Sequence, residues 1–86
     1  MINIYYASME SCSPCKQFLP IVQQAAQESN IVINYIDAKE NRYFVEKYGI
    51  SSVPTIVGVA EGGTMVFKRV GVMAKQELLR LFSNIY

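Results

Sequence analysis

Two short segments in the first half of the chain consist mainly of apolar and aromatic residues. Residues 2–6 and 31–36 are rich in Ile, Val and Tyr and are too short to form stable helices, so both predict buried strands. Between them, residues 13–29 carry apolar side chains at helical spacing and polar side chains on the other side, which predicts a long amphipathic helix. Its apolar stripe comprises Phe18, Val22, Ala25 and Ala26.

A second, shorter helix is indicated in the middle of the chain. Residues 40–48 have the spacing of a helix that turns Phe44 and Tyr48 inward. Gly49 follows directly, and a glycine at that place readily adopts the left-handed conformation that ends many helices. We therefore expect this helix to stop at Gly49.

The last third of the chain has the pattern of a hairpin followed by a helix. Residues 55–59 and 65–69 predict two strands, and the pair Gly62-Gly63 between them supplies the positive φ that tight turns need. Residues 74–85 again carry apolar side chains at helical spacing, which predicts a last amphipathic helix. The predicted order of elements is therefore βαβ, helix, ββα.

Length, charge and hydropathy exclude several classes of protein. With 86 residues, 51% of them hydrophobic, residues 1–86 have room for a single α/β domain. The net charge is +1 with acidic and basic residues interleaved, unlike the basic stripe that nucleic acid requires. No apolar run approaches the roughly 20 residues that cross a bilayer, and the first residues lack a secretory signal. We expect a cytoplasmic monomer without nucleic-acid or membrane partners.

The motif Cys12-Ser13-Pro14-Cys15 stands between the first strand and the long helix. A C-x-x-C places two thiols within disulfide reach and indicates thiol–disulfide exchange. Cys12 falls at the helix mouth, where free amides and the helix dipole favour an anion, whereas Cys15 heads the apolar stripe. Cys12 is therefore expected to be the more exposed and more acidic thiol.

The prolines of the long helix have different expected effects. Pro14 lies in the first turn, where its missing N–H costs no internal hydrogen bond and its fixed φ stiffens the loop. Pro20 lies well inside, where it should bend the helix around the sheet; the alternative is two short helices that meet there.

A metal site is the main alternative role for the two cysteines. Zinc in one chain generally needs four ligands, and the sequence offers two thiols, no His and one nearby carboxylate, Glu10. A zinc site, or a cluster bridged by Cys12 of two chains, would therefore need a second copy of the chain. We expect no metal and no cofactor beyond a redox-active disulfide.

Three motifs recur in a recognisable order and spacing. They are the C-x-x-C-K-x-x-x-P run of residues 12–20, the Y-G-I-x-x-x-P-T run of residues 48–55, and the Val70-Gly71 pair before the last helix. Together they resemble the thioredoxin family over nearly the whole chain. The resemblance implies a minimal thioredoxin fold, a mixed four-stranded sheet flanked by three helices, without the N-terminal strand and helix of ordinary thioredoxins.

The resemblance also implies roles for individual residues. Cys12 would be the nucleophile and Cys15 the resolving thiol, with Ser13 and Pro14 as the loop between them. Pro54 matches the family's cis-proline, which faces the motif and, with the backbone of Val53, holds a substrate segment. The loop that borders the substrate groove in the family corresponds to Gly71 and Val72.

Four positions depart from the family's usual residues. Ser11 and Ser13 stand where Trp and Gly are usual, so the groove beside the nucleophile is more polar. Tyr6 and Ile33 stand where a buried acid and a lysine are usual, which removes the usual proton acceptor for Cys15. The Tyr6 hydroxyl, Glu10 or a water could replace it, or Tyr6 is simply a core residue.

The function implied by the resemblance is reduction of disulfides in client proteins, ribonucleotide reductase among them, with electrons from thioredoxin reductase. One alternative is a glutaredoxin that uses glutathione, and another is an oxidase or isomerase. A third is a binding subunit without catalysis, which would grip its partner with an apolar rim. That rim would comprise Met9, Val53, Pro54, Val72 and Met73.

Overall fold

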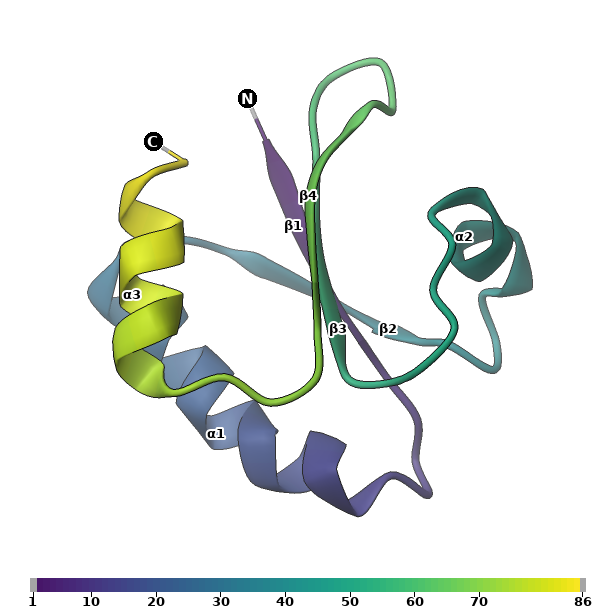
Figure 1. Cartoon of the computed structure of the whole chain (residues 1–86), viewed down its shortest axis with the longest axis horizontal. Coiled ribbons are helices and arrows are strands. Elements are labelled where there is room, and N and C mark those ends of the chain that lie inside the picture. Colours follow the sequence, from purple (N-terminus) through teal and green to yellow (C-terminus); the bar gives the residue numbers. More distant parts are fainter. Residues whose placement is uncertain (1, 86) are drawn as a thin grey trace.

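The computed structural model describes residues 2–85 as seven elements in the predicted order (Figure 1). They are β1 (Asn3–Ser8), α1 (Ser13–Glu28), β2 (Ile33–Asp37), α2 (Arg42–Lys47), β3 (Thr55–Val59), β4 (Met65–Val70) and α3 (Lys75–Ser83). Residues 1 and 86, which the predicted single domain includes, lie outside the described residues.

The four strands form one sheet in the order β2-β1-β3-β4. β1 is parallel to β2 and antiparallel to β3, and β3 is antiparallel to β4. Helices α1 and α3 cover one face of this sheet and α2 covers the other (Figure 1). The prediction of a mixed four-stranded sheet flanked by three helices is therefore confirmed.

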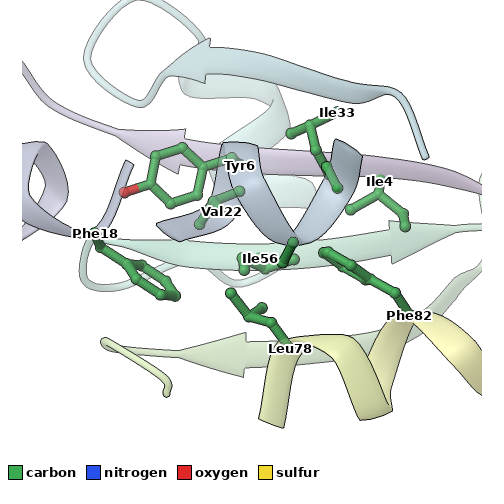
Figure 2. Close-up of a cluster of buried hydrophobic side chains, with 10 residues drawn as sticks. Ile4, Tyr6, Phe18, Val22, Ile33, Ile56, Leu78 and Phe82 are labelled. Atoms are coloured by element: carbon green, nitrogen blue, oxygen red, sulfur yellow. The ribbon is translucent and has the colours of Figure 1, made fainter. Parts of the chain in front are cut away.

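The larger core lies between the sheet and the pair α1 and α3 (Figure 2). Alternation along β1 places Ile4 and Tyr6 on this face, because successive strand residues point to opposite sides. The apolar stripe of α1 packs against them, and α3 adds Leu78 and Phe82. The buried residues drawn and labelled in Figure 2 are Ile4, Tyr6, Phe18, Val22, Ile33, Ile56, Leu78 and Phe82.

The smaller core lies under α2. Ala7 and Val57 point to this face of the sheet, and Tyr48 and Ile50 close over them. The ring of Phe44 lies 4.8 Å from the ring of Tyr48, centroid to centroid, so the inward orientation predicted for these two aromatics is correct. Since β3 is buried along its whole length, it is covered on both faces, as is usual for strands inside a layered α/β fold.

Helices α1 and α2 end in the same hydrogen-bonded motif. After α2, Gly49 has φ +62°, and the Ile50 N–H donates to the Val45 carbonyl at 2.9 Å, which confirms the predicted C-cap. After α1, Asn30 takes the left-handed position with φ +57°, and the Ile31 N–H donates to the carbonyl of Ala26. Both are Schellman endings, in which a left-handed residue satisfies carbonyls of the last turn.

Three predicted boundaries in the first half of the chain were wrong by two residues. β1 runs to Ser8 rather than to residue 6, because Ser8 still pairs with Asp37 of β2. β2 starts at Ile33 rather than at residue 31, because the ending of α1 occupies the residues before it. α2 starts at Arg42 rather than at residue 40, because the carboxylate of Asp37 accepts a hydrogen bond from the Lys39 N–H and holds a turn there.

Further differences occur in the last third of the chain and at Pro20. β4 extends one residue beyond the prediction, to Val70, which pairs with Thr55. α3 spans Lys75–Ser83 instead of residues 74–85, because Asn84 and Ile85 donate to carbonyls only three residues back. Helix α1 runs unbroken through Pro20, so the alternative of two short helices is wrong.

Gly58 of β3 leaves room for a neighbouring ring. It pairs with Phe67 of β4, and a Cβ at residue 58 would overlap the Phe67 ring. We predict that Gly58→Ala lowers the free energy of unfolding by about 1–3 kcal/mol, the usual cost of overpacking. Urea unfolding of the same substitution in a Phe67→Ala background is the control. An equal loss in both backgrounds would refute the role given to the ring.

Candidate functional site

The C-x-x-C motif forms the turn between β1 and α1. The Cys12 N–H donates to the Met9 carbonyl at 3.0 Å, and the Cys12 carbonyl accepts the Lys16 N–H at 3.2 Å. Cys12 is thus the N-cap of α1, with extended backbone angles, and Pro14 lies in the first turn, where a proline is compatible with the helix. The first amides of the helix therefore point toward the sulfur of Cys12.

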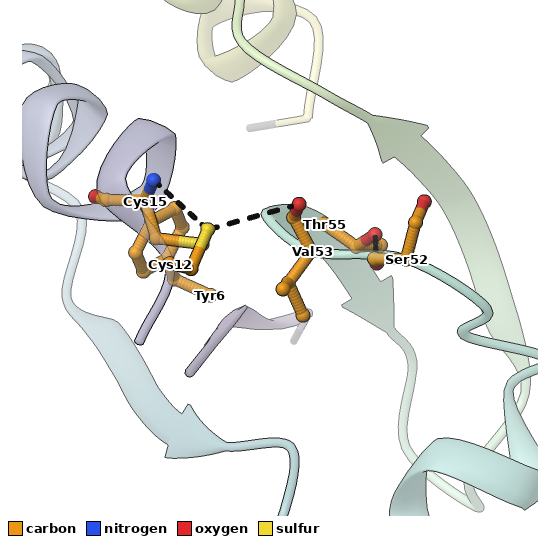
Figure 3. The surroundings of a disulfide bond; sticks show 6 residues. All are labelled: Tyr6, Cys12, Cys15, Ser52, Val53 and Thr55. Atoms are coloured by element: carbon orange, nitrogen blue, oxygen red, sulfur yellow. Dashed lines mark hydrogen bonds between the residues drawn. A yellow bond between two sulfur atoms is a disulfide. The ribbon is translucent and has the colours of Figure 1, made fainter. Parts of the chain in front are cut away.

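The two cysteines are joined by a disulfide, and their Cα atoms are 5.2 Å apart. Cys15 is buried, with 2% of its surface exposed, whereas Cys12 is half-buried. The Cys15 N–H donates to Cys12 Sγ at 3.2 Å (Figure 3). This amide and the helix dipole favour negative charge on Cys12 once the disulfide is opened. The predicted difference in exposure between the two sulfurs is confirmed.

The segment before β3 faces the disulfide (Figure 3). The Val53 carbonyl oxygen lies 3.9 Å from Cys12 Sγ, and the Val53–Pro54 peptide bond is cis. The hydroxyl of Thr55 donates to the Ser52 carbonyl at 2.7 Å, which fixes the turn that carries Val53. The backbone of Val53 is therefore held beside the sulfur that is nearer the surface.

The loop after β4 is tied to the same segment. The Gly71 N–H donates to the Pro54 carbonyl at 2.8 Å. Gly71 has φ +90°, a left-handed conformation that favours glycine, and Val72 beside it is exposed. Ser11 and Ser13 are also exposed. The contact of the Cys12 sulfur with Val53 and the backbone hydrogen bond between Gly71 and Pro54 thus bring these four residues into one cluster.

Tyr6 lies beneath the motif. Its hydroxyl donates to the Cys15 carbonyl at 2.7 Å, and its side chain is 1% exposed. Burial, with a smaller contribution from Tyr35, raises the pKa of Tyr6 to about 12. A neutral phenol engaged as a donor is a poor proton acceptor, so Tyr6 is a hydrogen-bonded core residue. Ile33 is likewise buried in the larger core.

A pocket of about 390 Å³ opens beside Cys15, and we call it the Cys15 pocket. Its lining includes Tyr6, Ser8, Glu10, Cys15, Tyr35 and Asp37. Tyr35 and Asp37 were not among the residues predicted for the site. Their position could have been inferred, because β1 and β2 are parallel. Strands that run in parallel bring their carboxyl ends to the same edge of the sheet.

The rest of the described chain offers no metal cluster. Within residues 2–85, no three Cys, Asp or Glu side chains are grouped so that they could hold a metal ion. Over the same range, none of the helices has both the length and the apolar composition to span a membrane.

Thioredoxins are among the known proteins similar to this chain. The thioredoxin family model matches residues 1–84. The thioredoxin of Chlamydia caviae is 32% identical over 76 residues, 87% of this chain and 74% of that protein. The thioredoxin of Bacillus subtilis is 36% identical over 75 residues, 85% of this chain and 71% of the relative. A solved mutant thioredoxin from Halobacterium salinarum superposes with a TM-score of 0.86 at 28% identity, over 96% of this chain and 73% of that one.

The raised pKa of Tyr6 predicts a loss of stability at alkaline pH. An unfolded tyrosine ionises near pH 10, whereas folded Tyr6 keeps its proton to about pH 12. Between these values the folded state binds more protons, so the free energy of unfolding falls as the pH rises. We predict that Tyr6→Phe flattens this decline, and that at neutral pH it costs about 0.5–1.5 kcal/mol for the lost hydrogen bond.

Urea unfolding at a series of pH values from neutral to strongly alkaline measures the decline. Tyr43→Phe is the matched control, because Tyr43 is exposed on α2 and lacks the buried hydrogen bond of Tyr6. A decline of the same slope in wild type and Tyr6→Phe would contradict the assignment.

Proposed function

The chain belongs to the thioredoxin family and is a thiol–disulfide oxidoreductase, and we propose that it reduces protein disulfides through a Cys12–Cys15 dithiol/disulfide cycle. The observation that carries this proposal is the position of Cys12. Its sulfur caps helix α1, accepts the Cys15 N–H at 3.2 Å and lies 3.9 Å from the Val53 carbonyl oxygen.

The proposed cycle uses the two sulfurs in sequence. The Cys12 thiolate attacks one sulfur of a client disulfide, which forms a mixed disulfide and releases the other client sulfur as a thiolate. Cys15 then loses its proton and attacks Cys12 Sγ, so that the mixed disulfide breaks and the Cys12–Cys15 disulfide forms. Two electrons have passed to the client, which leaves as a dithiol after taking up two protons.

We assign the client segment to the cluster around Val53 and Pro54. The Val53 backbone lies beside Cys12, where an extended segment could pair with it as an additional strand. Gly71 and Val72 would border this segment on one side and Ser11 on the other. Two of these positions, Ser11 and Val72, are exposed, as contact with a partner protein requires.

The proton of Cys15 needs an acceptor other than Tyr6. We propose that water in the Cys15 pocket accepts this proton. The carboxylates of Glu10 and Asp37 in the lining would stabilise the positive charge of the protonated water. This route would replace the buried acid of the family. Because no carboxylate at residue 6 opposes a thiolate, both thiols would also be more acidic than beside a buried acid.

The partners that we propose follow the family. Disulfide-containing proteins, ribonucleotide reductase among them, would be the clients, and thioredoxin reductase would return electrons; glutathione is the alternative electron source. We further propose that residues 1–86 act as a single-domain cytoplasmic monomer. Its one continuous sheet supports the domain proposal, and two cysteines placed for redox chemistry fit a reducing compartment.

Substituting each cysteine separately distinguishes the roles of the two sulfurs. We expect Cys12→Ser to abolish reduction of an insulin disulfide, because the remaining thiol, Cys15, is buried and cannot reach the client. Cys15→Ser should retain the first attack and accumulate a stable mixed disulfide with the client, visible as a larger species on a non-reducing gel. Full activity of Cys12→Ser would refute the cycle, whereas a wild-type protein that reduces no insulin would favour a binding subunit.

The redox potential of the Cys12–Cys15 couple tests the direction of electron flow. We expect the Cys12–Cys15 couple, equilibrated with dithiothreitol and glutathione buffers, to have a potential below the glutathione poise of about −220 to −260 mV. The protein would then donate electrons to clients. A potential near or above about −180 mV, the range of isomerases and oxidases, would contradict the proposed role as a reductant.

A further inference from the structure

A second depression lies on the α2 side of the disulfide, and we call it the α2 groove. It has a volume of about 550 Å³ and a floor of apolar side chains from three parts of the chain, Met9, Val45, Ile50 and Val53. Val53 belongs to both the groove and the disulfide environment, because its carbonyl oxygen lies 3.9 Å from Cys12 Sγ. A segment held at Cys12 therefore continues directly into the groove.

Two cations line this groove and no acid does. Lys39 comes from the turn after β2, and Arg42 is the first residue of α2. Both are exposed, and within residues 2–85 neither cationic head has an acidic partner within ion-pair distance. Ser51 and Ser52 complete the lining with two hydroxyls. The groove thus combines an apolar floor with unmatched positive charge.

The acids near the disulfide lie in a different depression. Glu10, Asp37 and Glu40 line the neighbouring one, which shares Met9 and Lys39 with the α2 groove. The Asp37 carboxylate accepts the backbone N–H of Lys39 at 2.9 Å, so it holds the turn rather than neutralising the ammonium. The lining of the neighbouring depression therefore has three acids and one lysine, whereas that of the α2 groove has two cations and no acid.

From this arrangement we infer that the α2 groove selects client segments that carry an acidic residue close to the reactive cysteine, with Lys39 and Arg42 binding its carboxylate. This inference rests on the proposed function and names the clients that it favours. An arginine pairs with a carboxylate through two parallel hydrogen bonds, and the apolar floor accommodates the neighbouring side chain of the segment. A small inorganic anion would leave that floor uncovered, so a peptide is the occupant that fits both features.

Disulfide-linked peptides test the preference directly. One series places a single Glu at successive positions on either side of the cysteine, and matched series carry Gln or Lys there. We expect the wild-type protein to reduce the best Glu peptide about fivefold faster than its Gln counterpart, measured as kcat/KM, and the Lys counterpart more slowly still. The ratio should shrink as salt is added, because exposed charges are screened.

Two double variants that have the same net charge as each other test whether the preference for Glu peptides comes from the groove. Lys39→Gln with Arg42→Gln removes the groove cations, whereas Lys47→Gln with Arg80→Gln removes two cations that do not line it. Each pair lowers the formal net charge from +1 by two units. We expect the first pair to lose the Glu preference and the second pair to keep it.

The other outcomes separate the inference from the proposed function. If the wild-type protein reduces none of the peptides, the proposed function fails together with the inference. If it reduces Glu, Gln and Lys peptides equally well, the function stands and the inference is overturned. A Glu preference that survives in the groove variant, or that is lost equally in both variants, would also overturn it, because the groove cations would not be its source.

Discussion

The hydrogen bonds at the start of helix α1 are the interactions on which the site depends. Cys12 caps the helix, so its sulfur accepts the Cys15 N–H at the surface, while the next turn carries Cys15 into the core. Two chemically identical side chains three residues apart are thereby given opposite environments. Packing of Phe18 and Val22 against the sheet holds the helix at this angle, and the Tyr6 hydroxyl fixes the Cys15 carbonyl from below.

Tyr6 shows how the fold tolerates the replacement of a buried acid. A carboxylate at this depth would carry a charge that must be compensated, whereas the phenol fills the space with an aromatic ring and satisfies its single polar group on the Cys15 carbonyl. The ring also packs edge-on against Phe18, with centroids 6.0 Å apart. Beneath the helix, the chain therefore has a phenol that keeps its proton at neutral pH instead of a carboxylate.

Much of the fold and the centre of the site could be predicted because they follow from local patterns. The helical spacing of Phe18 and Val22 can be recognised within a few residues of sequence, and so can the C-x-x-C motif. What could not be predicted depends on contacts between distant segments or on one unusual backbone conformation. Asn30 takes a left-handed position that glycine usually fills and so shortened β2, and Asp37 reaches the site only because β2 pairs with β1.

The hydrogen bond between the Gly71 N–H and the Pro54 carbonyl has a consequence for design. It joins the residue before β3 to the residue after β4, so the open end of this antiparallel hairpin presents one backbone surface. Both sulfurs belong to the separate β1–α1 unit. The proposed redox chemistry and the proposed recognition of the client backbone therefore fall on two contiguous segments of the chain, which are joined by the pairing of β1 with β3. A chimaera that exchanges the hairpin as one piece would carry the proposed recognition surface with it and leave the C-x-x-C turn intact.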